Sequence, residues 1–460
     1  MNRLKKKKLK FLEKKILIGI YLSISIFLLI FKRPNTSQIE NRNLEKFPDK
    51  PNIKSFLSGK FFRDLSIWFS DTVPFRDDIL TISYKMRDLN GIETKIDMRK
   101  LELNENFNEE MTATISTASP SSMFLQLNKA SLSNANIEDT KKQTEVLDNK
   151  NFSMEKGVIV FGDGDNTRAV DVFQGFRNGD EFYSYTLNLY KEKFPKLNIY
   201  SMIVPNSVAY YCPDELKKYS ANQKKFIDNL NSLFVNVVKI PVYETLLEHM
   251  DEDIYLRTDH HWSPLGAYYA AKEFAKIAKV DFRDITTYDP FEINKFYGSY
   301  YRLTGIERLK NVYEKFIYYT PRNIIYKTEQ FKYVVDEKGN PIAKTELKQT
   351  DFFQQYTGGT PRAYQVYMGG DNNTTHVKTE GINSGRNLLI LKDSFGNPVP
   401  SYLFFSFDNI YVVDYRYFLD DLETFINSSR ITDILFINNV QSAMRDKASK
   451  NYRKFIGINE

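Results

Sequence analysis

Cysteine is almost missing from this sequence: Cys212 is the only one among 460 residues. A single thiol excludes an intrachain disulfide and any zinc site that is built from several thiolates. A free cysteine usually packs as a small apolar side chain, and we expect this of Cys212.

An excess of one charge is also missing once the first fifteen positions are set aside. The chain has a formal net charge of +6, but those positions hold eight of its 64 basic residues and one of its 58 acidic residues. The rest carries 56 basic and 57 acidic residues and is close to neutral. A near-neutral body excludes nucleic acid as the favoured partner.

Charged residues are absent from Ile16 to Phe31, a run rich in Ile, Leu and Phe. Lys-Arg-Pro at 32–34 follows it, rather than a small-residue cleavage site. As a helix the run spans roughly 24 Å, and snorkelling lysines extend it towards the ~30 Å of a bilayer core. We expect residues 1–34 to form a cytoplasmic basic tail and a single-pass transmembrane anchor, with a signal-peptide core as the alternative. The basic amino terminus then stays inside, and the globular part lies outside the cytoplasmic membrane.

Composition divides the remaining chain into three segments. Apolar residues at helical spacing, as in 56–69, favour a membrane-proximal helical segment over 35–102. Between 103 and 156 the sequence is rich in Asn, Ser, Thr, Lys and Glu and poor in aromatics, which is typical of a flexible linker or insertion. Residues 157–460 are expected to form the globular domain.

Short apolar runs alternate with helical patterns after Gly157. This alternation predicts a three-layer α/β fold in which helices flank a parallel sheet. Residues from about 285 to 380 break the rhythm with many Tyr and Phe and with glycine-containing turns, and they are interpreted as a β-rich insertion. The predicted strands are 158–161, 197–204, 235–239, 388–391, 409–413 and 434–437, and the predicted helices are 183–193, 224–233 and 265–279.

Histidine is scarce as well, with four in the chain, yet two of them are adjacent in the string Asp259-His260-His261-Trp262. Ser263 and Pro264 follow, and this pair predicts a helix start with a serine cap and proline in the first turn. The string therefore lies on a loop that enters a helix, where α/β proteins build their sites. A carboxylate two residues before an imidazole can orient it as a general base.

A nucleophile for that base is found in Ser394. The apolar run 388–391 leads into Lys392-Asp393-Ser394-Phe395-Gly396, so the serine lies on a strand-to-helix turn. Its backbone N–H at a helix start is a candidate to stabilise an oxyanion.

These motifs resemble a known family. The string Thr258-Asp-His-His-Trp262 resembles the defining tetrad of the DHHW family, and its pairing with Lys392-Asp-Ser-Phe395 is similar to the alginate O-acetylation proteins of the SGNH-like superfamily. The resemblance implies an SGNH-like α/β catalytic domain in which Ser394 is the nucleophile, His261 the base and Asp259 its orienting group. It implies transfer of an acetyl group to a polysaccharide hydroxyl, or to water, without a metal or other cofactor.

The sequence does not assign every hydrogen-bond donor of the expected site. Lys392 stands where other relatives have glycine, which leaves the second oxyanion donor unassigned. The candidates are the loop Gly369-Gly370 and the pair Tyr415-Arg416, while His260 and Trp262 are candidates for packing or for contact with substrate.

Three alternatives to an acetyltransferase follow from the same residues. A carbohydrate O-acetyl esterase shares the acyl-serine step and differs only in its acceptor. A zinc hydrolase would use Asp259, His260 and His261 together with distant His249 or His376. A non-catalytic envelope protein would bind glycan through the aromatics of the insertion. An extracytoplasmic transferase has no ready access to cytosolic acetyl-CoA, so the expected donor is a multi-spanning membrane acyltransferase.

Overall fold

The computed structural model describes residues 152–175, 178–336, 341–355, 362–371 and 373–458, together with single residues and short stretches between 33 and 148. The expected transmembrane run 16–31 and most of the expected linker lie outside the described residues. Within the described part, no helix combines the length and the apolar character that crossing a membrane requires. The chain divides into two compact units, one of residues 1–90 with 335–340 and one of 91–334 with 341–460.

The first unit contains a short antiparallel pair and helical residues. Strand β1 (Thr36–Ser37) pairs with β2 (Arg42–Asn43), and Phe61, Leu65, Trp68 and Phe69 are helical, within the segment expected to be so. The guanidinium of Arg33 lies 4.2 Å from the Trp68 ring centroid and donates to Thr72 Oγ1 at 3.0 Å.

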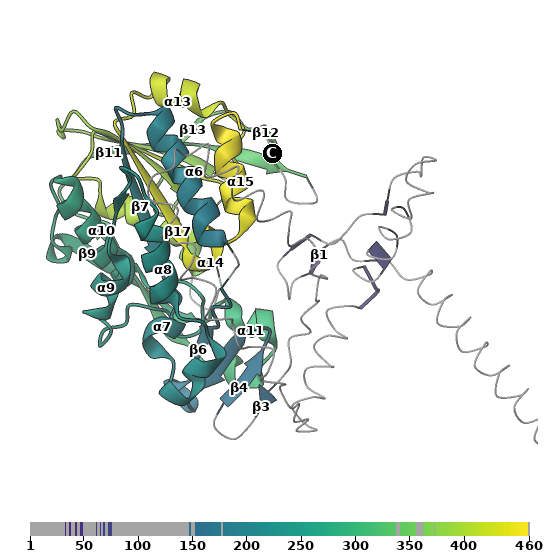
Figure 1. The fold of residues 1–460 in the computed structure, drawn as a ribbon. Coiled ribbons are helices and arrows are strands. Elements are labelled where there is room, and N and C mark those ends of the chain that lie inside the picture. Colours follow the sequence, from purple (N-terminus) through teal and green to yellow (C-terminus); the bar gives the residue numbers. More distant parts are fainter. Residues whose placement is uncertain are drawn as a thin grey trace, which may run out of the picture. The chain divides into compact units, whose positions relative to one another are not determined.

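The second unit is built on a mixed sheet of nine strands (Figure 1). Five of its strands, β16, β15, β17, β7 and β8, are parallel neighbours, and β14 joins them antiparallel at β16. The α/β class predicted from the sequence is therefore confirmed. In sheet order the strands are β12 (Pro341–Lys344), β11 (Tyr326–Val335), β14 (Asn373–Thr379), β16 (Asn409–Asp414), β15 (Asn387–Lys392), β17 (Asp433–Asn439), β7 (Asn198–Val204) and β8 (Val238–Lys239), with β13 (Lys348–Thr350) paired to β11.

Helices cover both faces of this sheet because its central strands are apolar on both sides. Leu388 and Ile390 of β15 pack with Phe274 of α10 on one face, whereas Leu389 and Leu391 pack on the other. The first face carries α9 (Val242–Leu247), α10 (Pro264–Ala278) and α12 (Val399–Tyr402). The second carries α6 (Gly179–Lys193), α8 (Gln223–Ser232), α13 (Leu422–Ser428), α14 (Val440–Ala443) and α15 (Asp446–Phe455). Figure 1 shows α6 and α15 side by side.

The run 158–161 was predicted to be a strand of the main sheet, and this is wrong. It is β5 of a separate antiparallel sheet with the order β3, β4, β5, β6. This sheet also corrects the end of the expected linker, because β3 and β4 lie before residue 157 and Phe152 of β4 is buried. The strands are β3 (Leu147–Asp148), β4 (Phe152–Glu155), β5 (Val158–Phe161) and β6 (Arg168–Asp171).

Residues 285–380 are rich in strands, but they do not form one separate insertion. Strands β11 to β14 extend the main sheet, which is why the sheet is mixed rather than parallel. Only β9 (Tyr288–Phe296) and β10 (Glu314–Pro321) form a hairpin-like pair of their own. Two further short helices of the unit are α7 (Val208–Tyr211) and α11 (Ser299–Thr304).

Candidate active site

The Asp259-His260-His261-Trp262 string lies on a tight loop directly before α10. Ser263 caps the helix by accepting a hydrogen bond from the N–H of Gly266 at 3.2 Å, and Pro264 occupies the first turn, as predicted. The loop folds back on itself, since the N–H of Leu256 donates to the carbonyl of His261 at 3.3 Å. The start of α10 thus holds the string beyond the carboxyl end of β15, where Ser394 lies.

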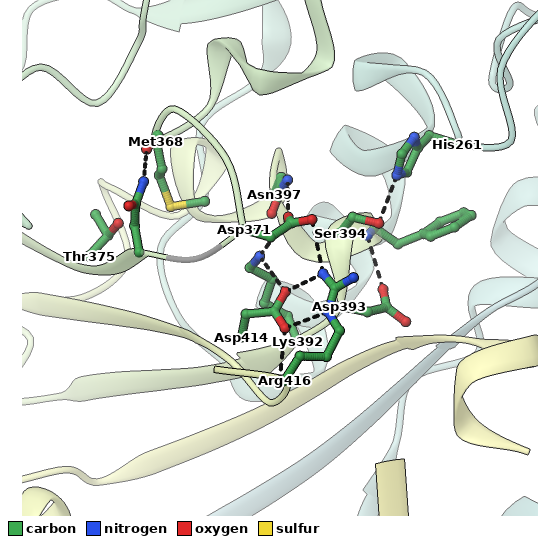
Figure 2. A network of polar contacts seen from close by, with 12 residues as sticks. His261, Met368, Asp371, Thr375, Lys392, Asp393, Ser394, Asn397, Asp414 and Arg416 are labelled. Carbon is green, nitrogen blue, oxygen red and sulfur yellow. Dashed lines mark hydrogen bonds and ion pairs between the residues drawn. The ribbon is translucent and has the colours of Figure 1, made fainter. Parts of the chain in front are cut away.

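Two hydrogen bonds join Asp259, His261 and Ser394 into a chain. Asp259 Oδ1 lies 2.6 Å from His261 Nδ1, and His261 Nε2 lies 2.8 Å from Ser394 Oγ. Figure 2 shows the imidazole of His261 directed at the serine. Asp259 and His261 are buried, whereas Ser394 is half-buried. The structure therefore brings together the three residues to which the sequence assigned chemistry, although 133 positions separate His261 from Ser394.

Backbone donors fix the Asp259 carboxylate. The N–H of His261 donates to Oδ1 at 3.0 Å and the N–H of Ser299 donates to Oδ2 at 2.8 Å. Burial alone would raise the pKa of Asp259, but the neighbouring His260 and His261 and these hydrogen bonds hold it well below its usual range. Asp259 is thus a carboxylate at neutral pH and can stabilise a protonated His261.

The segment after β9 was not recognised in the sequence, yet it supports this carboxylate. A Cβ atom on Gly298 would lie 2.3 Å from Asp259 Cβ and 2.4 Å from the carbonyl oxygen of Thr258. Glycine is therefore required for the backbone to pass this closely. The available signal was an isolated glycine among the Tyr and Phe of a segment expected to be rich in strands, which can mark a close approach of two backbones.

Glu314, at the start of β10, holds the other end of the string. Its carboxylate accepts hydrogen bonds from the backbone N–H groups of Arg257 and Thr258 at 2.9 and 2.8 Å. Burial raises the pKa of Glu314, and these hydrogen bonds oppose that effect. The β9–β10 pair therefore anchors the loop that carries Asp259.

Ser394 begins a single 3₁₀ turn, Ser394–Gly396, directly after β15. Asp393 caps this turn through Oδ1, which accepts from the N–H of Phe395 at 3.0 Å, while Oδ2 accepts from the N–H of Asn439 at 2.8 Å. Within the described part of the chain, the N–H of Ser394 has no hydrogen-bond partner. That N–H is available to an acyl oxygen, as expected from the sequence.

Several other candidate donors prove to be committed elsewhere. Trp262 is fully buried and its Nε1–H donates to the carbonyl of Phe395 at 2.9 Å. The N–H of Gly369 donates to Gln365 at 3.2 Å, and that of Tyr415 donates to Lys392 at 3.2 Å, while the Tyr415 ring packs against Tyr452. The expectation that the N–H of Gly369 or of Tyr415 serves an oxyanion is corrected accordingly, whereas Trp262 takes the packing role that was one of its two expected roles. The N–H of Gly370 stays a candidate.

Lys392 and Arg416 belong to a buried charge network instead (Figure 2). The Lys392 ammonium lies 3.3 Å from Asp371 Oδ1 and 3.1 Å from Asp414 Oδ2, and its side chain is 1% exposed. Arg416 binds Asp414 through Nε at 2.7 Å and Asp371 through Nη2 at 2.9 Å. Burial raises the pKa of Asp371 by itself, but Lys392 and Arg416 lower it well below its usual range. Gly369 and Gly370, with φ of 75° and 127°, form the turn that leads to this carboxylate.

Three residues of the string could ligate a metal ion, one through a carboxylate and two through imidazoles. Asp259, His260 and His261 present ligand atoms within 4.8 Å of one another. However, Asp259 Oδ1 and His261 Nδ1 face each other at 2.6 Å, so a zinc ion would have to displace that bond. His249 stacks on Tyr269 and His376 on Tyr411, and neither belongs to this group.

The chain matches one family model and several solved structures. The family model described as "DHHW protein" matches residues 40–109 and 127–413, which is most of the chain. This protein belongs to the DHHW family. A DHHW family protein from Eubacterium siraeum is 34% identical, with a TM-score of 0.59, and the match covers 67% of this chain and 98% of that one.

Two further structures are more distant from this DHHW protein. Bacillus cereus PatB1 is 18% identical with a TM-score of 0.49, over 63% of this chain and 98% of its own. The O-acetyltransferase domain of Pseudomonas putida AlgJ is 10% identical with a TM-score of 0.33, over 60% and 90%. No curated protein matches the sequence significantly.

Proposed function

We propose that this DHHW protein is an SGNH-like O-acetyltransferase that modifies a cell-surface or exported polysaccharide through an acyl-serine intermediate. The observation that supports it most is the hydrogen-bonded chain from Asp259 through His261 to Ser394, at 2.6 and 2.8 Å. A carboxylate, an imidazole and a hydroxyl in this order are the groups by which acyl-transfer enzymes activate serine.

The first half-reaction acylates the serine. His261 Nε2 takes the Ser394 Oγ proton as Oγ attacks the carbonyl carbon of the acetyl donor, and Asp259 stabilises the imidazolium. The N–H of Ser394 donates to the developing oxyanion. Collapse of the tetrahedral intermediate breaks the bond to the donor oxygen, which receives the proton from His261 and leaves acetyl-Ser394.

The second half-reaction passes the acetyl group to an acceptor. His261 removes the proton of an acceptor hydroxyl as its oxygen attacks acetyl-Ser394, and the proton then returns to Ser394 Oγ. A sugar hydroxyl gives an acetylated polysaccharide, whereas water gives acetate. The two outcomes share every residue of the first half-reaction.

The proposal includes a location and a donor. The uncharged run 16–31 anchors the chain in the cytoplasmic membrane with the amino terminus inside, and the globular domain acts on the outer side. A multi-spanning membrane acyltransferase supplies the acetyl group there.

The decisive experiment uses the full chain with p-nitrophenyl acetate as an activated acetyl ester. We expect a burst of p-nitrophenol and an acetyl group on Ser394, located by mass spectrometry of peptides, with transfer to added polysaccharide. Ser394→Ala should abolish the burst, while Ser428→Ala, an exposed serine of α13, should retain it. A burst of normal size in Ser394→Ala would contradict the proposal.

A further inference from the structure

His260 is the accessible member of the two adjacent histidines. Its side chain is 40% exposed, compared with 9% for His261 and 4% for Asp259. The two imidazole rings lie with centroids 3.8 Å apart and planes inclined by 38°, and the ring centroids of His260 and Phe395 are 6.0 Å apart. His260 therefore lies next to the base and near the ring of the residue that follows the nucleophile, and its side chain is accessible to solvent.

One nitrogen of His260 is held in place by Ser299. Nδ1 lies 2.8 Å from Ser299 Oγ, while the backbone N–H of the same serine donates to Asp259 Oδ2 at 2.8 Å. Ser299 thus ties the orientation of His260 to the position of the carboxylate that orients His261.

The same contacts favour one tautomer. The anionic Asp259 carboxylate lies 3.6 Å from His260 Nδ1, so a proton on that nitrogen is stabilised by the charge and is donated to Ser299 Oγ. Nε2 then carries the lone pair and is a hydrogen-bond acceptor. No residue in the described part of the chain bonds to Nε2.

A purely structural role accounts poorly for these features. A histidine kept for packing would bury its ring, and one kept for a hydrogen bond would need only Nδ1. Here Nε2 has no partner in the described part of the chain and belongs to a side chain that is 40% exposed, so a ligand hydroxyl can reach it in place of water.

We propose that His260 Nε2 accepts a hydrogen bond from a second hydroxyl of the acceptor, adjacent to the hydroxyl that His261 deprotonates, and that Ser299 is its positioning residue. This inference rests on the proposed function. Neighbouring hydroxyl oxygens of a sugar ring are separated by about the length of a hydrogen bond, ~3 Å, which suits two imidazoles stacked this closely. The acceptor class is therefore a vicinal diol.

The chemistry balances without a further reactant. The first hydroxyl loses its proton to His261, its oxygen forms the ester bond, and the bond from Ser394 Oγ to the acetyl carbon breaks and Oγ is reprotonated. The second hydroxyl keeps its proton and only donates it to His260. Water has no second hydroxyl next to the oxygen that attacks. The contact with His260 therefore favours transfer to a sugar over hydrolysis.

The test compares two acceptors with the full chain and p-nitrophenyl acetate. We expect wild type to acetylate cis-1,2-cyclohexanediol about tenfold faster than cyclohexanol, the size of one hydrogen bond. His260→Ala should bring this ratio close to one, and His260→Gln, which keeps an acceptor atom, should restore part of it. Ser299→Ala should lower the ratio less than His260→Ala. His249→Ala, which removes an imidazole stacked on Tyr269, should keep the wild-type ratio.

The burst is measured for each variant and separates the two proposals. The role of His260 would be overturned if His260→Ala kept the wild-type ratio or lost rate equally towards both acceptors. A wild-type ratio in both single variants, His260→Gln and Ser299→Ala, would also overturn it. A wild-type chain without a burst and without acetyl-Ser394 would overturn the proposed function and this inference with it.

Discussion

The imidazole of His261 stacks face to face on the ring of Tyr364, with centroids 3.9 Å apart and planes inclined by only 12°. Tyr364 is buried in the 3₁₀ helix Ala363–Val366, and its hydroxyl has no hydrogen-bond partner among the described residues. The ring, rather than the hydroxyl, therefore limits how far His261 can rotate away from Ser394.

This contact predicts different effects for two substitutions of Tyr364. Tyr364→Phe keeps the stacked ring and should leave the p-nitrophenyl acetate burst within about twofold of wild type. Tyr364→Leu removes the flat surface, and a misplaced base should slow the burst by ~10²-fold. Equal burst rates in the two variants would show that stacking does not position His261.

Gly298 is predicted to tolerate no side chain. Gly298→Ala would push against Asp259 and Thr258 at less than 2.5 Å, so we expect a loss of ~1–3 kcal/mol in the free energy of unfolding and a burst at least tenfold slower. Gly381→Ala is the control, because its φ of 79° imposes backbone strain but nothing lies within 4 Å of the new methyl group. That variant should lose ~1 kcal/mol and keep the wild-type burst. A normal burst in Gly298→Ala would refute the prediction.

Lys392 is predicted to matter through its buried charge. Lys392→Met leaves Asp371 and Asp414 with Arg416 as their remaining cation, and we expect a loss of ~3 kcal/mol or more, measured by chemical denaturation. Lys327→Met breaks an exposed pair with Glu380 at 3.0 Å and should cost less than ~1 kcal/mol. Combining Lys392→Met with Asp371→Asn restores the charge balance and should recover part of the loss. Equal losses in the two single variants would contradict this account.

Glu181 makes stability depend on pH. Burial, helped by the charge of Asp180, raises its pKa from 4.5 to about 7, and its Oε2 has no partner among the described residues. The folded state therefore binds the Glu181 proton more tightly than the unfolded state does. The free energy of unfolding falls as pH rises from about 4.5 to about 7 and stays lower above pH 7.

Glu181→Gln should remove this dependence. We expect the variant to exceed wild type by ~1–3 kcal/mol in the free energy of unfolding at pH 9, with no such advantage at pH 5. Glu423→Gln is the control, because Glu423 also lies in a first helical turn but is 54% exposed beside Lys193. It should change stability by less than ~1 kcal/mol at both pH values. An advantage of Glu181→Gln that is the same at pH 5 and pH 9 would disprove the assignment.

Local signals in the sequence were sufficient for the elements that carry the reacting groups. The Ser263-Pro264 cap and the strand leading into Ser394 depend on neighbours in the chain, and both are present as predicted. Such signals did not place the run 158–161 correctly, because a short apolar stretch is compatible with a strand of a parallel sheet and with a strand of an antiparallel sheet. Only its antiparallel pairing with β4 and β6 distinguishes the two.

The supporting residues could not be found in the same way, because their contacts cross long stretches of chain. Ser299 meets Asp259 across 40 positions, and Lys392 meets its partners Asp371 and Asp414 across 21 and 22. In the sequence, Lys392 was notable only because other relatives have glycine at this position. In the fold, its ammonium is one of two cations that pair with the carboxylates of Asp371 and Asp414. Tyr364 carries no motif and is identified only by its place against His261.

The order of strands in the main sheet has a consequence for self-association. The sheet ends on β8, with two residues, and at the other side on β12 and β13, with four and three. Unpaired backbone on an edge strand is a template for strands of other molecules, and short edges with exposed lysines such as Lys239 and Lys344 reduce it. The folded protein should therefore resist edge-to-edge aggregation, since neither end of this sheet offers a long apolar strand to another molecule.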